Sequence, residues 1–301
     1  MANSNGWGDG AANNAIGWGQ GANNTIGWGS SHATSWAGAT DIVGLATDAD
    51  AQAFITAAAI TDATQITAIN NLVVGMKADG IWTKMKAIYP FVGGTASTHK
   101  WNLKDPRDLD AAFRLVFNGG WTHSSNGATP NGTNGYADTK ISPSSVFSSN
   151  DNISLGYYTR DVSTIGLALV AEMGSANLDY SNGVYIVGRY NGDSKNYTRI
   201  SSSATNSFVV SATAGLYYAS RIASNQYKIL RNGNILSTPA IASSGRTSNN
   251  MWIGGINYGI AAEYGIGQCA FSYVSDGLTD TEASNLYSRV QTYQNSLNRA
   301  V

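Results

Sequence analysis

The stretch YKILRNGNILST, residues 227–238, decides the fold class of this chain. Asn232 and Gly233 stand between two arms in which apolar and polar side chains alternate. Alternation with a period of two puts successive side chains on opposite faces of a strand, and Asn-Gly between two such arms is the strongest short-range signal for a tight hairpin turn. The stretch therefore predicts an antiparallel β-hairpin.

Similar segments precede and follow the hairpin. Each is short, rich in Val, Ile, Tyr, Phe or Thr, and bounded by Asn, Gly, Asp or Ser, which is typical of strands. They are DLDAAFRLVFNG (108–119), NISLGYYTR (152–160), IGLALVAEM (165–173), GVYIVGRY (183–190), NYTRISS (196–202), SFVVSATAGLYYASRI (207–222) and MWIGGINY (251–258). Because no helical segment separates them, the pattern favours an antiparallel β-sandwich over a parallel α/β sheet.

Helical periodicity precedes the strands. Capping signals at Thr47 with Asp50, and at Asp62 with Gln65, predict two helix starts. Apolar residues then share one helical face, namely Ile66, Ile69, Leu72, Val73 and Met76. A short third helix is predicted from Ile81, Trp82, Met85 and Ile88, ending before Pro90.

A last helix is predicted near the C-terminus. Thr279 and Glu282 form a capping signal. The apolar stripe that follows consists of Leu286, Val290, Tyr293 and Leu297. We expect this stripe to dock onto the sandwich.

The chain is weakly charged. Only 12% of its 301 residues are charged and its net charge is −1. The chain therefore has no excess of positive charge to attract nucleic acid, and we do not expect a nucleic acid as partner. No stretch approaches the ~20 apolar residues of a membrane span, and the N-terminus lacks signal-peptide features. We expect cytoplasmic synthesis without a signal peptide, and no membrane partner. The single cysteine, Cys269, lies in an alternating apolar run and is expected to be buried.

Residues suited to catalysis are few and scattered. The chain has three glutamates, Glu172, Glu263 and Glu282, and no Glu-x-Asp-x-Glu run that brings two carboxyl groups into one cleft. Glu282 is assigned to the helix cap and Glu172 to a strand rim. His99 and His123 lack the spacing of a zinc site and are expected to be surface or satisfied loop histidines. We therefore do not expect an enzyme.

Three segments resemble known proteins. CAFSYVSDGLTDTEASNLYSRVQTYQ (269–294) resembles the end of concanavalin A-like jelly rolls of the laminin-G-like kind, and NGTNGYADTKISPSS (131–145) with SLGYYTR (154–160) resembles their opening. Residues 82–139 are similar as a block to a segment recurring in bacteriophage virion proteins that carry this domain. The resemblance implies a mainly β fold, an antiparallel jelly-roll sandwich, and often recognition of carbohydrate or host surfaces. Fold class and domains follow: an attachment arm at 1–44, a helical linker or collar at 45–99, and the sandwich with its C-terminal helix at 100–301.

The predicted arm repeats the tripeptide Gly-Trp-Gly. In extended Ile-Gly-Trp-Gly the Ile and Trp side chains share one face, and two and a half such repeats cannot enclose a core. Three buried tryptophans at about 2–3 kcal/mol each could hold the arm on another surface. The attachment residues are Trp7, Ile16, Trp18, Ile26, Trp28 and Trp36. Two alternatives are that these rings fold back on the same chain, or that they stack on sugars.

Ligand residues are harder to select from sequence. Aromatic side chains in predicted strands offer four candidates for sugar binding, Tyr157, Tyr158, Tyr190 and Trp252. Calcium is the one cofactor left open, through Asp179 and Asp193 with Asn182 and Asn196 in loops at strand ends. The alternative for these Asx residues is turn formation.

The function we predict is that of a structural component of a phage particle, a tail fibre, head fibre or capsid decoration. The arm would bind other virion proteins, and the sandwich would project outward and adhere to host-cell glycans. A homo-oligomer is expected, with a trimer attractive for a fibre. The alternative is a free lectin module or a carbohydrate-active enzyme, acting apart from any particle.

Overall fold

The computed structural model describes residues 47–160, 172–190, 192–211, 214–260 and 262–301. The compact unit that it describes spans Asp48–Val301. All six predicted attachment residues, Trp7, Ile16, Trp18, Ile26, Trp28 and Trp36, lie outside the described residues. None of the helices in the described part of the chain has the length and apolar character needed to cross a membrane.

Two sheets form a sandwich. Among the described residues, sheet 1 has nine strands in the order β11 (Asn206–Val209), β10 (Lys195–Ser202), β9 (Gly183–Tyr190), β8 (Met173–Ser175), β15 (Trp252–Ile253), β6 (Tyr136–Asp138) and β3 (Val116–Asn118), with β16 (Gly255–Asn257) beside β8 and β17 (Ala262–Tyr264) beside β16. Its pairs are antiparallel, except that β16 runs parallel to β8.

Sheet 2 faces sheet 1. Within the same described ranges it has eight antiparallel strands in the order β14 (Asn234–Ser237), β13 (Gln226–Arg231), β12 (Gly215–Ala223), β7 (Ile153–Thr159), β18 (Cys269–Ser275), β5 (Gly127–Pro130) and β4 (Trp121–Ser124), with β2 (Met85–Tyr89) beside β18. The predicted mainly β antiparallel sandwich is confirmed.

The main core lies between the sheets. Val184 and Ile186 of β9 and Ile253 of β15 point inward from sheet 1, and Leu155 of β7 and Ala219 of β12 point inward from sheet 2. All five are fully buried. Burying a side chain of Val, Leu or Ile size stabilises a fold by about 1.5–3 kcal/mol, so this layer joins the two sheets.

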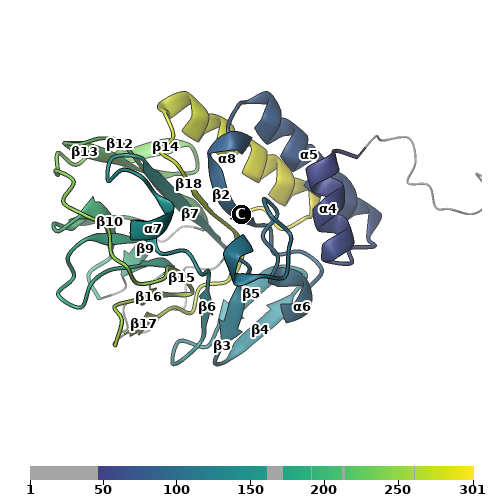
Figure 1. Cartoon of the computed structure of the whole chain (residues 1–301), viewed down its shortest axis with the longest axis horizontal. Coiled ribbons are helices and arrows are strands. Elements are labelled where there is room, and N and C mark those ends of the chain that lie inside the picture. The colour runs from purple at the N-terminus through teal and green to yellow at the C-terminus, as the bar shows by residue number, and fades with distance from the viewer. Residues whose placement is uncertain (1–46, 161–171, 191, 212–213, 261) are drawn as a thin grey trace, which may run out of the picture. The chain divides into compact units, whose positions relative to one another are not determined.

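A second apolar layer lies between sheet 2 and the helices α4 (Ala49–Ala57), α5 (Ala63–Ala78) and α8 (Asp280–Ser296). Tyr158, Tyr218 and Tyr273 of sheet 2 meet Leu72 of α5 and Leu286 of α8 in this layer. Figure 1 shows α5 and α8 side by side on this side of the sandwich. The short elements are η1 (Trp82–Lys84), α6 (Ala96–His99), η2 (Asp110–Ala112) and α7 (Pro143–Val146).

The helix caps match the sequence signals in two of three places. The Asp62 side chain accepts from the Gln65 amide at 2.8 Å and begins α5. Thr279 and Glu282 form a reciprocal capping box at the start of α8. The signal at Thr47 was wrong: Asp48 caps α4 by accepting from the amide of Asp50, and it also binds Lys77.

The third predicted helix is wrong beyond its first turn. Trp82–Lys84 is a 3-10 turn, and Met85–Tyr89 is strand β2, which pairs with β18. Ile88 faces the helices while Ala87 and Tyr89 face the sandwich core. Both faces of β2 are covered, so its apolar residues do not alternate with polar ones. A short continuous apolar segment of this kind cannot be told from a buried helix by its periodicity.

The domain boundary expected at residue 99 does not divide the described chain. β2 belongs to sheet 2, and α4 and α5 share their apolar layer with α8 and the sheet. The 48–99 segment is thus an integral layer of the sandwich unit and not a separate collar.

The hairpin at Asn232–Gly233 is confirmed. β13 pairs with β14, and the two turn residues have φ angles of 48° and 81°. Two consecutive left-handed residues match a type I′ turn, whose twist suits antiparallel strands. A Cβ on Gly233 would lie 2.9 Å from the Tyr287 ring, so both backbone and packing favour glycine there.

Candidate binding site

The outward face of sheet 1 carries aromatic and apolar side chains. Inward Val184 and Ile186 of β9 alternate with outward Tyr185 and Val187. An outward sheet face that meets solvent is ordinarily polar. Helices α5 and α8 cover sheet 2, on the opposite side of the sandwich, and α4 packs beside α5 (Figure 1). This face of sheet 1 is therefore the first place to look for a ligand.

A small cavity opens on that face, and we name it the tyrosine hollow. Its volume is about 150 Å³. It is lined by Tyr180, Tyr185, Val187, Tyr197, Ile256, Tyr258 and Glu263. These side chains come from β9, β10, β16, β17 and the adjoining loops. Register brings them together: Tyr197 pairs with Val187, and Ile256 pairs with Glu263.

The rings of the tyrosine hollow are held by specific contacts. Tyr180 and Tyr258 meet edge to face, with ring centroids 5.0 Å apart. The Tyr258 hydroxyl donates to Glu263 Oε2 at 2.8 Å. Tyr180 remains 50% exposed, so its ring is available at the rim. The hollow thus combines fixed rings with one exposed ring.

Gly174 permits the close packing behind the tyrosine hollow. In β8 it pairs with Trp252 on one side and with Tyr185 on the other, and Ile256 also lies in register with it. Its φ is +141°, and a Cβ there would lie 2.3 Å from the Tyr185 Cβ. No side chain larger than hydrogen fits, so glycine allows β9 to approach β8 closely at Tyr185.

The charged groups around the hollow are partly paired. Glu263 is half-buried, and burial raises the pKa of its carboxyl although the hydrogen bond from Tyr258 opposes the shift. The hydroxyl of Tyr197 donates to Asp193 at 2.6 Å, and this bond raises the pKa of Tyr197 to about 12. Arg199 donates through Nε to Thr205 at 2.6 Å.

Three further rings form an aromatic stack on the same sheet. Tyr136 of β6 and Trp252 of β15 lie face to face, with centroids 3.7 Å apart and planes 19° apart. Tyr264 of β17 is nearly parallel to Trp252 at 6.4 Å. All three are half-buried. The stack, Tyr136, Trp252 and Tyr264, therefore offers partly open flat surfaces beside the hollow.

The four predicted sugar-binding residues separate into two pairs. Tyr157 and Tyr158 are 1% and 0% exposed; Tyr157 donates to the carbonyl of Gly267, and Tyr158 faces α8. Both are core residues of β7, whose two faces are covered, so their prediction as surface ligand residues is corrected. Trp252 belongs to the aromatic stack, and Tyr190 packs on Tyr197 at 6.1 Å beside the hollow.

The two predicted calcium aspartates lie apart. Asp179 precedes β9 and Asp193 follows it, so the strand separates them by roughly 20 Å. Asp179 accepts from the amide of Ser181, and Asp193 accepts from the amide of Lys195, which are turn-forming bonds. They cannot share one ion. Calcium stays a prediction for each loop by itself.

Glu172 is not at a rim, as the sequence suggested. It is 4% exposed, and its carboxyl accepts from the Gly188 amide inside the sandwich. Burial raises the pKa of Glu172 to about 8. Cys269 is buried as expected, and burial raises the pKa of its thiol.

The histidines are also corrected in part. His99 is only 1% exposed, and its Nδ1 lies 2.9 Å from Nδ1 of His123. Burial lowers the pKa of His99 to about 3, with the charges of His123 and Arg299 adding to the effect. Phe91 packs against His99 at 5.3 Å and Phe117 against His123 at 4.7 Å. The pair is a packed contact between the end of α6 and strand β4.

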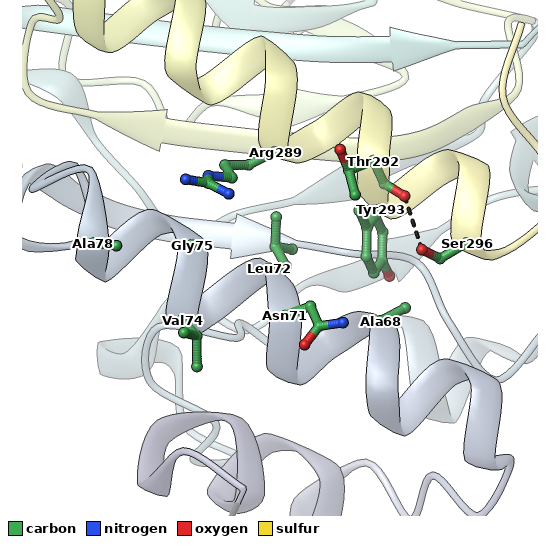
Figure 2. Close-up of a pocket in the computed structure, with 10 residues that line it drawn as sticks. All are labelled: Ala68, Asn71, Leu72, Val74, Gly75, Ala78, Arg289, Thr292, Tyr293 and Ser296. Carbon is green, nitrogen blue, oxygen red and sulfur yellow. Dashed lines mark hydrogen bonds between the residues drawn. The ribbon is translucent and has the colours of Figure 1, made fainter. Parts of the chain in front are cut away.

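A larger groove of about 380 Å³ lies between α5 and α8. Figure 2 shows Leu72 of α5 and Tyr293 of α8 each directed toward the opposing helix. Its charged residue, Arg289, is already bound to Asp79 by two contacts of 2.8 and 2.9 Å. This groove is larger than the tyrosine hollow, but the hollow combines aromatic rings with a half-buried carboxyl group, and apolar surface with a few placed polar groups is typical of ligand sites.

No family model and no curated protein matches this sequence. Similar solved structures include domain 4 of AbnA, a GH43 extracellular arabinanase from Geobacillus stearothermophilus, in complex with arabinotriose (13% identity, TM-score 0.42, 67% of this chain and 98% of that domain). Trypanosoma rangeli sialidase is 11% identical with a TM-score of 0.48, and the match covers 74% of this chain and 38% of the sialidase. The binding domain of botulinum neurotoxin serotype G is 15% identical with a TM-score of 0.44, and the match covers 68% of this chain and 50% of that chain. This chain spans half or less of the latter two. Likeness at this level carries no ligand or activity to this chain.

Sequence reasoning missed most of the site. Tyr136, Tyr180, Tyr185, Tyr197, Tyr258 and Tyr264 were not selected, and Glu263 was taken as an isolated residue. One signal could have found part of it: in GVYIVGRY (183–190) the set that alternates with Val184 and Ile186 also carries large apolar or aromatic side chains, Tyr185 and Val187, although a solvated strand face is ordinarily polar.

Proposed function

We propose that this domain binds carbohydrate on the outward face of sheet 1, without catalysis, as the projecting part of a phage particle. The observation that carries the binding proposal is the presence of both the tyrosine hollow and the aromatic stack on sheet 1, where strand β17 supplies Glu263 to the hollow and Tyr264 to the stack. Apolar patches of this kind on a protein surface mark interaction sites.

The chemistry of these rings suits a saccharide. Tyr and Trp combine a flat apolar surface with a polar group, which matches a sugar ring that has C–H faces and hydroxyl edges. Trp252 and Tyr264 supply flat surfaces, while Glu263 and the tyrosine hydroxyls supply hydrogen-bonding groups next to them. A binding site of this type needs apolar area and a few placed polar groups, and both are present.

The positions of the three glutamates support binding without hydrolysis. Retaining glycosidases hold two carboxyl groups about 5–5.5 Å apart at the cleaved bond. Glu263 lines the hollow, whereas Glu172 is inside the sandwich and Glu282 caps α8. The two aspartates near the hollow are engaged elsewhere, because Asp193 accepts from Tyr197 and pairs with Lys195, and Asp179 accepts from the amide of Ser181. We expect glycans that the protein binds to remain intact after prolonged incubation with it, and released sugar would overturn this part of the proposal.

The particle role rests on the sequence. Residues 82–139 resemble a segment of phage virion proteins, and residues 1–44 repeat Gly-Trp-Gly, which suits an anchoring arm. We propose that the arm binds other virion proteins, that the chain is a homo-oligomer, and that the sandwich contacts host glycans. Mass spectrometry of purified particles tests the location: the protein should be present in stoichiometric amounts, and its absence from particles would contradict the proposal.

A glycan array tests the binding proposal. The wild-type protein should bind a defined set of glycans, and Trp252→Ala and Tyr258→Ala should each weaken binding about tenfold or more, since a ring at the centre of an interface contributes 2 kcal/mol or more. Tyr287→Ala on α8 is the matched control, because Tyr287 packs on the helical layer of sheet 2. A blank array, or equal losses in all three variants, would contradict the proposal.

A further inference from the structure

The tyrosine hollow is too small for a whole sugar chain. Its volume of about 150 Å³ lies below the roughly 300–1,000 Å³ of pockets for drug-sized ligands. It therefore suits one substituent of a ligand whose remainder lies on the open face of sheet 1. The lining decides what kind of substituent that is.

Rings surround the cavity on several sides. Four of its seven lining residues are tyrosines, and Val187 and Ile256 supply apolar surface. A cation within about 6 Å of an aromatic ring is attracted by the negative charge on the ring face, and groups of such rings bind quaternary ammonium ligands. The edge-to-face contact of Tyr180 with Tyr258 sets two rings at an angle of 70°, as a cage requires.

One carboxyl group, that of Glu263, lies among these rings without a paired cation. Among the described ion pairs Glu263 has no partner, whereas Asp193 is paired with Lys195 at 3.1 Å. Arg199 is another cation nearby; its guanidinium lies 5.8 Å from the Tyr185 ring, and Asp179 of the neighbouring loop interacts with its charge. The acidic groups Asp179, Asp193 and Glu263 are matched in number by the basic groups Arg189, Lys195 and Arg199, and Glu263 is the charged group that lines the hollow itself.

Hydrogen-bonding capacity separates two kinds of cation. A primary ammonium has three donors that need acceptors. The hollow offers few acceptors to such a group: Tyr197 donates to Asp193, Tyr185 is bonded to Thr205 at 3.2 Å, and Glu263 accepts from Tyr258 through Oε2, which leaves Oε1 of Glu263 as the main acceptor among ring and aliphatic surface. A quaternary ammonium has no N–H group and leaves no donor unsatisfied.

We propose that the tyrosine hollow binds a quaternary ammonium group of the choline type. The inference deepens the proposed function, on which it rests for the nature of the larger ligand: the recognised surface polymer carries a methylated ammonium substituent. The rings of Tyr180, Tyr197 and Tyr258 stabilise the cation, and Glu263 supplies the counter-charge, whereas the Tyr185 ring already lies against Arg199. Since burial raises the pKa of Glu263, binding is accompanied by proton release and strengthens as pH rises through that pKa.

The test is a calorimetric titration of the full chain with choline and tetramethylammonium, each at constant ionic strength. Both should bind saturably. Ethanolamine, a primary ammonium, and 3,3-dimethyl-1-butanol, which has the shape of choline without its charge, should bind on the order of tenfold more weakly or worse. Glu263→Gln should reduce choline affinity by a similar factor and leave the neutral alcohol unchanged.

Two variants serve as controls. Tyr258→Phe keeps the ring and should retain choline binding, and Glu282→Gln alters a carboxyl of the α8 cap and should have no effect. Lack of saturable binding by the folded wild-type chain, or equal affinity for choline and its neutral analogue, overturns the inference. Binding of neutral glycans together with failure to bind choline overturns it while leaving the proposed function standing.

Discussion

Replacing Glu172 with Gln should stabilise the protein at neutral pH. Glu172 is buried inside the sandwich, and its carboxyl accepts from the amide of Gly188. Burial raises its pKa from an ordinary 4.5 to about 8. Gln keeps a carbonyl oxygen for the Gly188 amide and has no proton to lose, so the variant isolates the cost of the ionisable group.

The magnitude follows from linkage between ionisation and folding. Between pH 4.5 and 8 the unfolded chain releases the Glu172 proton while the folded chain retains it, so stability falls as pH rises through that window. At pH 7, ionisation of Glu172 stabilises the unfolded state relative to the folded state by about 3 kcal/mol, at about 1.4 kcal/mol for each pH unit above 4.5. The Gln variant avoids this loss of stability, but burying its extra amide N–H group costs the folded variant about 1–2 kcal/mol.

Urea unfolding of both proteins from pH 4 to pH 8 measures the effect. His99 works in the opposite direction, because its lowered pKa makes stability fall as pH drops below about 6.5. That contribution is common to both proteins and cancels in their difference. The free energy of unfolding of Glu172→Gln relative to wild type should therefore rise by about 3 kcal/mol between pH 4 and pH 7.

Glu282→Gln is the control with the opposite sign. Burial raises the pKa of Glu282, but hydrogen bonds from Lys84 and Thr279 outweigh it and leave the pKa below its ordinary value. Its stabilisation is present above the unfolded pKa and lost in acid, so the variant should lose stability at pH 7 relative to pH 3. A pH-independent difference between Glu172→Gln and wild type would refute the reasoning, since it would mean that Glu172 is hydrated in the folded protein.

Three further predictions concern the fold and the arm. Arg299→Ala should lower the free energy of unfolding by about 3–5 kcal/mol in chemical denaturation, because its buried guanidinium donates to the carbonyls of residues 90, 91 and 270; a loss below 1 kcal/mol would contradict this. Gly233→Val should cost about 1–2 kcal/mol in the same assay, since it forces a β-branched residue to φ of +81°; an unchanged midpoint would show that the turn adapts. Deleting residues 1–44 should abolish incorporation into particles, and normal copy number in purified particles would remove the anchoring proposal.

The parts of the fold that the sequence predicted are those specified locally. The hairpin needs only Asn232 and Gly233 between alternating arms, and α8 needs only its capping box and apolar stripe. β2 was missed because its assignment depends on β18, almost two hundred residues away, and on the helices that cover its other face. The N-terminal cap was misplaced by one residue because both Thr47 and Asp48 are good capping residues.

The site was harder to predict than the fold, for a related reason. Tyr185, Tyr197, Tyr258 and Glu263 come from four separated segments and meet only through strand register and the parallel pairing of β16 with β8. Sequence alone does not show which face of a strand another layer covers. For this reason the sequence did not distinguish Tyr157 and Tyr158 from Trp252. Tyr157 and Tyr158 lie on strand β7, whose two faces are both covered, whereas Trp252 is a half-buried member of the aromatic stack.

The crystal structure of the protein with a saccharide selected on the array tests the central claim most directly. The account predicts sugar density on the outward face of sheet 1, in contact with Trp252 or Tyr264 and with a substituent inside the tyrosine hollow. Density in the groove between α5 and α8, or at any site that leaves these rings uncovered, would contradict it.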